Sequence, residues 1–351
     1  MFAEKIINWY SENGRQLPWR GIRNPYFIWL SEIILQQTRI EQGRSYYERF
    51  IEEYPTVRHL AEASEEQVLK SWQGLGYYSR ARNLHQAAQH IAFELGGVFP
   101  DSYEGILALK GVGRYTAAAI ASFAYRLPYP VIDGNVYRLI ARLYGIYTPI
   151  GTDQAYKEFE QLLKHLIDRE RPDLFNQAIM DFGSMYCKPA GYDCGHCIFR
   201  QECAAYRSGS VEQLPVRPQP VRVKERYFYY FDIRWNAAEP VTLVQQRDAG
   251  DIWQGLYELP LYEAEKPIAK SRLKAELGEV LEGWLGENLG KMEMGQMMTH
   301  KLTHRTIRAQ FVRVFLDGEP LKIPEKMRAV TMSELKTLPI SRLIDRYLSE
   351  L

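Results

Sequence analysis

The chain has 351 residues, of which 46% are hydrophobic and 25% charged, and its formal net charge is +1. This length allows two globular domains, and no apolar run approaches the ~20 residues needed to cross a bilayer. Residues 1–207 hold equal numbers of basic and acidic side chains, which excludes a protein that coats a polyanion by bulk charge. Residues 1–14 include acids and no long apolar core, so we expect no secretory signal.

The first half of the chain predicts helices. Residues 26–38 form an apolar run of helical length, and Ser64 with Gln67 forms a capping box ahead of a second helix. Residues 78–95 predict a helix that ends at two consecutive glycines, 96–97. Two further helices are expected at 115–125, which is rich in alanine, and at 135–144.

In the second half of the chain, the hydrophobic pattern changes from the helical repeat to the alternation that is typical of strands. Residues 208–224 contain three prolines and no acid after Glu212, which is typical of an extended basic linker. Beyond it, residues 227–235, 241–247 and 305–315 alternate as strands do, and one helix is expected near 267–277. We therefore predict an all-α domain at 1–207, a linker at 208–224 and an α+β domain at 225–351.

All four cysteines lie within one short segment, in a C-x6-C-x2-C-x5-C pattern: Cys187, Cys194, Cys197 and Cys203. Disulfides predominate in small domains of oxidising compartments, which this chain does not resemble. A structural zinc site prefers two close pairs of ligands, and only Cys194 and Cys197 form such a pair. An iron–sulfur cluster is the third possibility. The spacing does not decide between zinc and a cluster.

A glycine-rich turn at residues 109–117 precedes the alanine-rich helix. Gly111 and Gly113 allow a tight turn, and the N–H groups that open the following helix form an anion site. The natural anion for such a helix end is a DNA phosphate. The alternative interpretation of this segment is an ordinary turn between two helices.

Two carboxylates stand out. Glu32 lies among apolar residues of a predicted helix, where it is either on a solvated stripe or partly buried. Burial would raise the pKa of its carboxyl, and a glutamate kept protonated near neutral pH is a general acid. Asp133 precedes a helix start in an Asp-Gly-Asn turn, where it is either a simple helix cap or a functional acid.

Taken in order, these motifs resemble the helix-hairpin-helix DNA glycosylase superfamily, the endonuclease III group, and the first half is similar to the MutY adenine glycosylases. The resemblance covers nearly all of residues 1–207, and its densest stretches are residues 17–20, 29–38, 74–84, 131–135 and 177–187. It implies a helix-hairpin-helix domain in which the four cysteines hold a [4Fe–4S] cluster.

The resemblance also implies roles for residues. Glu32 would protonate N7 of adenine, and Asp133 would stabilise the sugar cation, directly or through a covalent intermediate. Tyr115 and Asn135 would hold the aspartate and the sugar, and Gln177 would contact the adenine edge. Tyr115 occupies the position at which strand-nicking relatives carry a lysine, which implies a monofunctional glycosylase.

The implied substrate is duplex DNA with adenine opposite 8-oxoguanine or guanine. Gln37 and Tyr77 lie in segments that match DNA-penetrating loops and would fill the gap left by the flipped base. We expect a monomer without membrane association, in a bacterial cytoplasm near the nucleoid.

The second half resembles a Nudix domain but lacks the acidic Nudix helix, so we expect no nucleotide hydrolysis. By resemblance, Thr303 and His304 would read 8-oxoguanine, with Leu302 in place of an aromatic residue. His300 and His304 lack a nearby acid or cysteine with which to form a metal site.

Three other functions remain possible from the sequence. A bifunctional pyrimidine-lesion lyase is disfavoured by Tyr115 and by the long second domain. A non-catalytic lesion-binding protein is disfavoured by the joint presence of Glu32, Asp133, Tyr115 and Asn135. A zinc-ribbon protein is the third.

Overall fold

The computed structural model describes residues 1–218, 223–235, 237, 239–286, 291–320 and 322–350. The chain forms two compact units. The first is helical and comprises Met1–Glu62 and Asn83–Gln219, and the second contains the sheet and comprises Ala63–Arg82 and Pro220–Leu351. The central part of the predicted linker, residues 219–222, lies outside the described residues.

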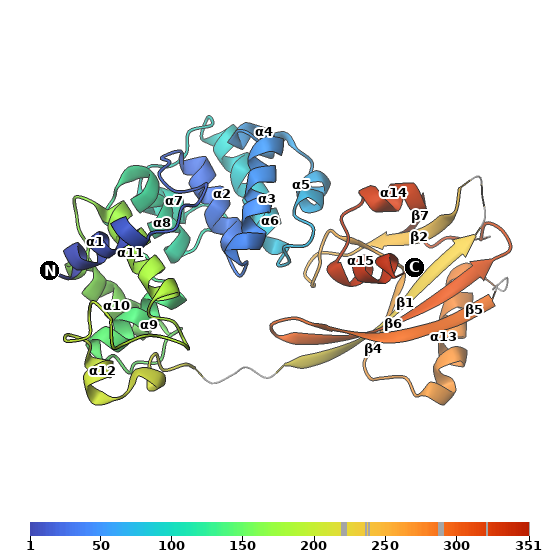
Figure 1. The fold of residues 1–351 in the computed structure, drawn as a ribbon. Coiled ribbons are helices and arrows are strands. Elements are labelled where there is room, and N and C mark those ends of the chain that lie inside the picture. The colour runs from blue at the N-terminus through green and yellow to red at the C-terminus, as the bar shows by residue number, and fades with distance from the viewer. Residues whose placement is uncertain (219–222, 236, 238, 287–290, 321, 351) are drawn as a thin grey trace. The chain divides into compact units, whose positions relative to one another are not determined.

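The helical unit contains most of the helices in Figure 1. The segment α6, Ser79–Gln89, spans the division between the units and continues into the π-helical turn η1, His90–Glu94. The others are α1 (Phe2–Asn13), α2 (Pro25–Leu35), α3 (Ile40–Glu53), α4 (Val57–Glu62), α7 (Tyr103–Leu107), α8 (Arg114–Tyr125), α9 (Gly134–Tyr144), α10 (Asp153–Leu166), α11 (Pro172–Met185), α12 (Ala204–Ser208) and the short η2 (Val211–Gln213).

Helices α2 and α8 form the centre of this unit. Every residue of α2 from Ile28 to Ile34 is buried, and α8 is buried from Thr116 to Ala124. The alanines of α8 allow α2 and α7 to approach closely, because small side chains leave room for a neighbouring backbone. Helix α11 packs on α1, α8 and α9. The charged residue Glu32 is thereby carried into the apolar centre.

The second unit is built on a seven-stranded mixed sheet with the order β3-β2-β1-β6-β5, in which β4 pairs with β1 and β7 with β2. Strands β1 and β6 run parallel along their whole length, and the other pairs are antiparallel. The elements are α5 (Glu65–Ser71), β1 (Lys224–Trp235), β2 (Val241–Gln246), β3 (Tyr257–Glu258), β4 (Leu261–Ala264), α13 (Lys270–Leu285), β5 (Lys291–Lys301), β6 (Arg305–Leu316), β7 (Met327–Thr331), α14 (Met332–Thr337) and α15 (Arg342–Ser349).

Both faces of this sheet are covered. Alternate residues of β1 point to opposite faces, so Phe228 and Tyr230 join one core while Tyr229 and Phe231 join the other. Helices α14 and α15 cover the first face, and α13 covers the second (Figure 1). The sheet is therefore the middle layer of an α+β unit.

The fold class predicted from the sequence is confirmed in both units. The capping box at Ser64 is present, and Gly96 and Gly97 end the helical run with positive φ. The helix expected at 267–277 is longer and continues to Leu285, because Leu281 and Leu285 extend its apolar stripe. The sequence analysis did not predict β5, α14 or α15.

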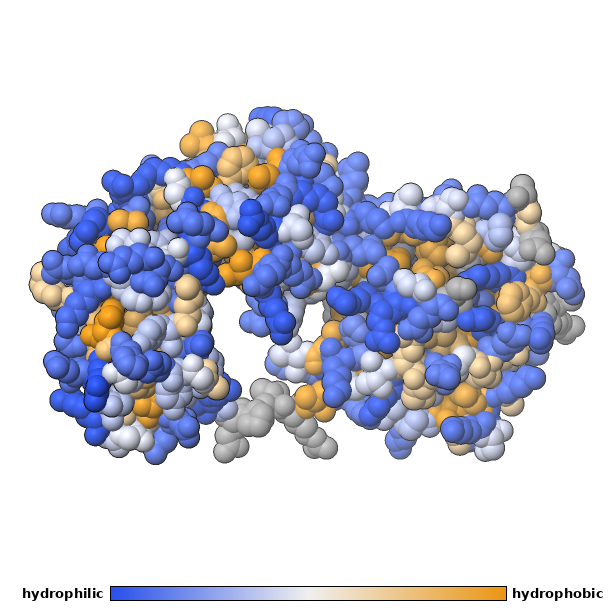
Figure 2. All heavy atoms as spheres, viewed as in Figure 1, coloured by the Kyte–Doolittle hydropathy of each residue, from blue (hydrophilic) through white to orange (hydrophobic). Residues whose placement is uncertain are grey.

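The surface of each unit is mainly hydrophilic. In Figure 2, hydrophobic residues on the visible face form small separate patches among polar ones, as is usual for proteins in water. Within the described residues, no helix combines the length and the apolar character that a membrane span requires.

Candidate active site

A cavity in the helical unit brings together five of the predicted site residues. Its volume is about 220 Å³. Helices α2, α8, α9 and α11 and the segment that joins α1 to α2 contribute to its wall. The predicted residues that line it are Glu32, Tyr115, Asp133, Asn135 and Gln177.

Glu32 is the buried acid of this cavity. Only 8% of its surface is exposed, and it lies between Ser31 and Ile33 in the buried run of α2. Burial raises the pKa of Glu32 to about 7; the charge of Asp133 adds to this effect, while a hydrogen bond from Tyr115 opposes it. The carboxyl is therefore poised to hold or to release a proton near neutral pH.

Asp133 is both a helix cap and a wall of the cavity. One carboxylate oxygen accepts hydrogen bonds from the backbone N–H groups of Asn135 at 2.9 Å and Val136 at 2.7 Å. The other accepts one from the Asn135 side chain at 2.7 Å. Burial raises the pKa of Asp133, while these hydrogen bonds oppose the rise. The helix-cap interpretation is confirmed, and the role of Asp133 as a functional acid stays a prediction.

Tyr115 lies near both acids on the first turn of α8. Burial, and then the charges of Glu32 and Asp133, hold the pKa of its hydroxyl well above the usual value. The hydroxyl lies within hydrogen-bonding range of Glu32 and 3.5 Å from Sδ of Met180. Tyr115 is therefore a neutral phenol beside both acids, and its expected role of holding Asp133 stays a prediction.

Gln177 is held in place by a residue that the sequence analysis did not identify. The Tyr10 hydroxyl donates a hydrogen bond to Oε1 of Gln177 at 2.6 Å. This contact fixes the orientation of the amide at the cavity wall. Tyr10 is an aromatic residue of α1 without a local motif, so only the packing of α1 on α11 reveals it.

A buried ion-pair network supports the same wall. Asp181 is fully buried and accepts hydrogen bonds from the Arg20 guanidinium at 2.6 and 2.7 Å and from the Arg15 guanidinium. Burial alone would raise the pKa of Asp181, but the hydrogen bonds from Arg20 and Arg15 outweigh it and lower the pKa. The sequence signal for Arg20 was its place in the LPWR stretch, but its partner lies in α11, far along the chain.

The turn before α8 has the geometry of an anion site. Gly111 has φ +77°, and a Cβ at this position would lie 2.6 Å from Cβ of Asn83, so a larger residue does not fit. Gly113 is the N-cap of α8, and within the described residues no side chain caps this helix. Its first N–H groups are therefore available to an anion.

Gln37 and Tyr77 share an unusual backbone geometry. Both have positive φ, 57° for Gln37 and 49° for Tyr77, although neither is a glycine. The left-handed conformation is uncommon for such residues and is found most often at functional loops. Tyr77 is also 51% exposed. Each side chain belongs to a different unit, and neither lines the cavity around Glu32.

The four cysteines line a second cavity in the helical unit and none forms a disulfide. Within the described residues, no group of three or more histidine, cysteine or acidic side chains is close enough to hold a single ion. Burial raises the pKa of the Cys197 thiol to about 11, and neighbouring cysteines add to the rise. A thiolate in this cavity is therefore disfavoured unless a positive charge stabilises it, as a bound metal group would.

Arginines of α9 hold the cysteine segment. Arg142 is 3% exposed and donates to the backbone carbonyls of Lys188 at 2.8 Å and of Val211 and Leu214 at 3.0 Å. Its Nη1 lies 3.5 Å from Sγ of Cys187. The cavity thus has a fixed cationic wall on one side.

A second arginine connects this segment to the first cavity. Arg138 donates to the Cys187 carbonyl at 2.7 Å and to the Asn135 side-chain oxygen at 2.9 Å. Asn135 in turn donates to Asp133. The cysteine segment and Asp133 are therefore joined by one chain of hydrogen bonds along α9.

Thr303 and His304 form the tip of the hairpin between β5 and β6 in the second unit. The N–H of Leu302 donates to the Arg305 carbonyl at 2.8 Å, which closes a two-residue turn. Oγ1 of Thr303 lies 2.5 Å from the Tyr77 hydroxyl, and both residues belong to this unit. The fold thus brings together two residues that the sequence analysis had assigned to different loops.

Comparison with known proteins agrees with this geometry. Residues 30–167 match the HhH-GPD superfamily of base excision DNA repair proteins, and residues 233–350 match the NUDIX domain. The adenine DNA glycosylase of Buchnera aphidicola subsp. Acyrthosiphon pisum is 32% identical over 264 residues, which cover 75% of each chain. The chain belongs to the adenine DNA glycosylase family. The adenine DNA glycosylase of Mus musculus is 31% identical across 97% of this chain and 76% of its own length.

The enzyme is thus a hydrolase of N-glycosyl bonds that acts in base excision repair. Its fold is similar to that of a thermostable thymine-DNA glycosylase, with a TM-score of 0.55 and 27% identity over 59% of this chain and 95% of the other. A trapped endonuclease III–DNA covalent intermediate shares the fold, with a TM-score of 0.52 and 21% identity over 59% of this chain and 94% of that chain.

Proposed function

We propose that this adenine DNA glycosylase removes adenine paired with 8-oxoguanine or guanine in duplex DNA and leaves an abasic site in an unbroken strand. The observation that carries the proposal is the buried Glu32, with a pKa of about 7, in one cavity with Asp133. Two carboxyl groups of unlike protonation are what cleavage of a glycosidic bond requires.

In the proposed reaction, protonated Glu32 donates its proton to N7 of the flipped adenine. The bond between C1′ and N9 then breaks, and its electron pair leaves with the base. Ionised Asp133 stabilises the positive charge that develops on the sugar. Water adds to C1′ and gives up a proton, which restores Glu32. Tyr115 and Asn135 hold the two acids in position through the contacts described above.

We assign adenine contact to Gln177. Its Oε1 accepts from Tyr10, and a carbonyl oxygen has a second lone pair for the exocyclic amine of adenine. Because the contact to Tyr10 fixes the amide, Gln177 is set before the base arrives, which lowers the entropic cost of binding.

The residues of the cavity support a monofunctional reaction. Among the described residues, none of those that line it is a lysine. Strand cleavage through a Schiff base needs an amine at this place. The neutral phenol of Tyr115 occupies the region in question and cannot form that adduct.

Extrusion of the adenine leaves a gap in the duplex, and we propose that Gln37 and Tyr77 occupy it. Their strained backbone holds the side chains at the tips of turns, where insertion is possible. The free N–H groups after Gly111 and Gly113 would hold a phosphate of the same strand.

We propose that Thr303 and His304 read the base opposite the adenine. Both provide hydrogen-bonding groups at a hairpin tip, and Tyr77, a proposed gap-filling residue, contacts Thr303. Leu302 packs against the core of the sheet unit instead of presenting an aromatic ring to the DNA.

We further propose that Cys187, Cys194, Cys197 and Cys203 hold a [4Fe–4S] cluster. Four iron ions need a wider ring of thiolates than one zinc ion does, which suits cysteines that share a cavity without forming a single-ion site. When bound, the cluster supplies a structural centre for this segment and takes no part in bond cleavage.

The proposed organisation is a glycosylase domain at 1–207, a linker at 208–224 and a lesion-recognition domain at 225–351. We propose that the enzyme acts as a monomer in a bacterial cytoplasm, on nucleoid DNA. The absence of an acidic Nudix helix from α13 supports recognition of DNA, and not nucleotide hydrolysis, as the work of the second domain.

Single-turnover excision tests this proposal. End-labelled duplexes carry adenine opposite 8-oxoguanine, guanine, cytosine or thymine, and each is assayed with and without hot alkali. We expect alkali-dependent cleavage opposite 8-oxoguanine and guanine only. Nicking without alkali would contradict the monofunctional reaction, and equal excision opposite all four bases would contradict the proposed specificity.

A further inference from the structure

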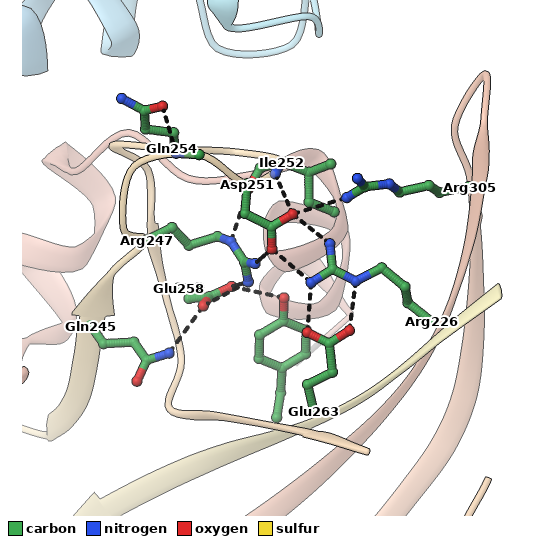
Figure 3. A network of polar contacts seen from close by, with 11 residues as sticks. Arg226, Gln245, Arg247, Asp251, Ile252, Gln254, Glu258, Glu263 and Arg305 are labelled. Carbon is green, nitrogen blue, oxygen red and sulfur yellow. Dashed lines mark hydrogen bonds and ion pairs between the residues drawn. The ribbon is translucent and has the colours of Figure 1, made fainter. Parts of the chain in front are cut away.

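One carboxylate in the sheet unit, that of Asp251, binds three arginines. It accepts hydrogen bonds from Arg226 at 2.6 and 2.6 Å, from Arg247 at 2.5 Å and from Arg305 at 2.9 Å. The N–H of Ile252 adds a fourth donor at 2.7 Å. Figure 3 shows the three guanidinium groups directed toward this carboxylate.

The three arginines come from different parts of the unit. Arg226 lies in β1, Arg247 follows β2, and Arg305 is the first residue of β6, immediately after the tip formed by Thr303 and His304. Asp251 lies in the loop between β2 and β3 (247–256), which we call the bracing loop. Its carboxylate therefore ties the bracing loop to β1 and to the base of the hairpin.

Other contacts join the bracing loop to β5 and to the beginning of α6. The ring of Trp253, a non-glycine residue with φ 59°, lies edge-on to that of His300 in β5 at 5.6 Å. The carbonyl of Gln254 accepts a hydrogen bond from Arg82 at 2.7 Å. On the other side of the hairpin, the carbonyl of His304 accepts from the N–H of Lys224 at 3.1 Å. The tip is therefore held from both sides.

The arginines differ in what they would lose without Asp251. Arg226 also pairs with Glu263 at 2.6 Å, and Arg247 also pairs with Glu258 at 3.0 Å. Within the described residues, Arg305 forms no ion pair other than the one with Asp251. Loss of the Asp251 charge would thus release Arg305 selectively, while Arg226 and Arg247 would keep a carboxylate partner.

We propose that Asp251 is a positioning residue for recognition of the base opposite the adenine. By holding Arg305, it fixes the two-residue tip so that Thr303 and His304 meet that base in one geometry. This inference rests on the proposed function, because it assigns a cause to the specificity proposed for the tip. Neither Asp251 nor Arg305 takes part in bond cleavage.

Two variants and one matched control test it. Asp251→Asn keeps the shape of the side chain and removes its charge, whereas Arg305→Gln removes the cation that Asp251 binds. The control is Glu263→Gln, which removes one carboxylate partner of Arg226. Glu263 does not contact Arg305. Single-turnover rate constants are measured with adenine opposite 8-oxoguanine and opposite guanine. We expect both test variants to narrow the ratio of the two constants by about fivefold, which is typical of one partly exposed charged hydrogen bond, and the control to keep it.

A second readout separates positioning from general destabilisation and does not depend on excision. Hydrogen exchange of the Leu302 amide, which closes the turn, should become faster in both test variants and not in Glu263→Gln. Arg305→Lys keeps the positive charge, so its ratio of the two rate constants should lie closer to that of wild type than the ratio of Arg305→Gln does. Melting temperatures identify any variant that is globally unstable, and Arg305→Gln, at a half-exposed site, then carries the test.

The outcomes are distinguishable. If wild type discriminates between the two opposite bases while both variants keep the wild-type ratio and the Leu302 exchange rate, the role of Asp251 is overturned. If wild type excises equally opposite both bases while Leu302 exchange still responds to the variants, the proposed reading of the opposite base by the tip fails and the bracing contact stands. If Glu263→Gln narrows the ratio of the two rate constants as much as the test variants do, the selective role of Arg305 is overturned.

Discussion

Glu32 on α2 and Asp133 at the start of α9 line one cavity, and the negative charge of Asp133 acts on the carboxyl of Glu32. Burial raises the pKa of Glu32 to about 7, and the negative charge of Asp133 contributes to that rise. Asp133 in turn accepts three hydrogen bonds, which favour its ionised form. One acid is thus suited to donate a proton and the other to stabilise a cation.

The first prediction concerns the proton donor. Glu32→Gln should lower the single-turnover excision rate by about 10²–10⁴-fold while DNA binding is kept, because the amide cannot protonate adenine. Excision kinetics and a binding titration on the same duplex measure the two effects. Glu41→Gln, at an exposed site on α3, is the control. Near-normal excision by Glu32→Gln would refute the assignment.

The second prediction concerns pH. The reaction needs protonated Glu32, so the excision rate should be highest below pH 7 and fall above it, by about tenfold per pH unit at the alkaline end. The rate should also fall in acid once Asp133 becomes protonated. A rate profile under single-turnover conditions locates both limbs. A rate that stays constant through the alkaline limb would mean that Glu32 is not the acid.

The third prediction concerns stability. Folding raises the pKa of Glu32 from 4.5 to about 7. The contribution of this residue to the free energy of unfolding is therefore fully present below pH 4.5 and is lost as the pH rises through about 7. Above pH 7 the buried charge therefore destabilises the fold. Glu32→Gln should stabilise the protein there by up to about 3 kcal/mol, since one pKa unit corresponds to about 1.4 kcal/mol. Urea midpoints below pH 5 and above pH 8 measure the difference, and an equal effect at both values would contradict it.

The fourth prediction concerns the ion pairs behind the cavity. Asp181→Asn leaves Arg15 and Arg20 without their buried partner and should destabilise the protein by about 3–5 kcal/mol. Because the pKa of Asp181 is lowered on folding, this contribution is present near neutral pH and lost in acid. Denaturation curves for Asp181→Asn and for Asp153→Asn, which removes an exposed pair, provide the comparison. Equal effects would show that burial of the network is unimportant.

The fifth prediction concerns the cysteine cavity. The purified protein should absorb near about 400 nm and contain iron and acid-labile sulfide. Cys197→Ser should lose this absorbance and lower the melting temperature and DNA affinity more than the excision rate of bound substrate. Zinc without sulfide in the purified protein would refute the cluster.

Short-range sequence patterns predicted much of the fold of this protein. The apolar run of α2, the capping box at Ser64, the glycines that end the long helix and the alternation of β1 follow from short-range rules, so the fold class could be predicted. The apolar neighbours of Glu32 left two placements open, a solvated stripe or partial burial, and the packing of α2 decided for burial. The motif spacing pointed to Asp133 and Tyr115.

The tertiary structure alone decided which distant groups meet. Tyr10 orients Gln177, Arg138 links Cys187 to Asn135, and Asp251 holds Arg305. None of these pairs follows a local period, because a side chain selects its partner by where the chain returns after folding and not by sequence distance. Sequence therefore pointed to the residues proposed to carry the chemistry, whereas packing determined the contacts that orient them.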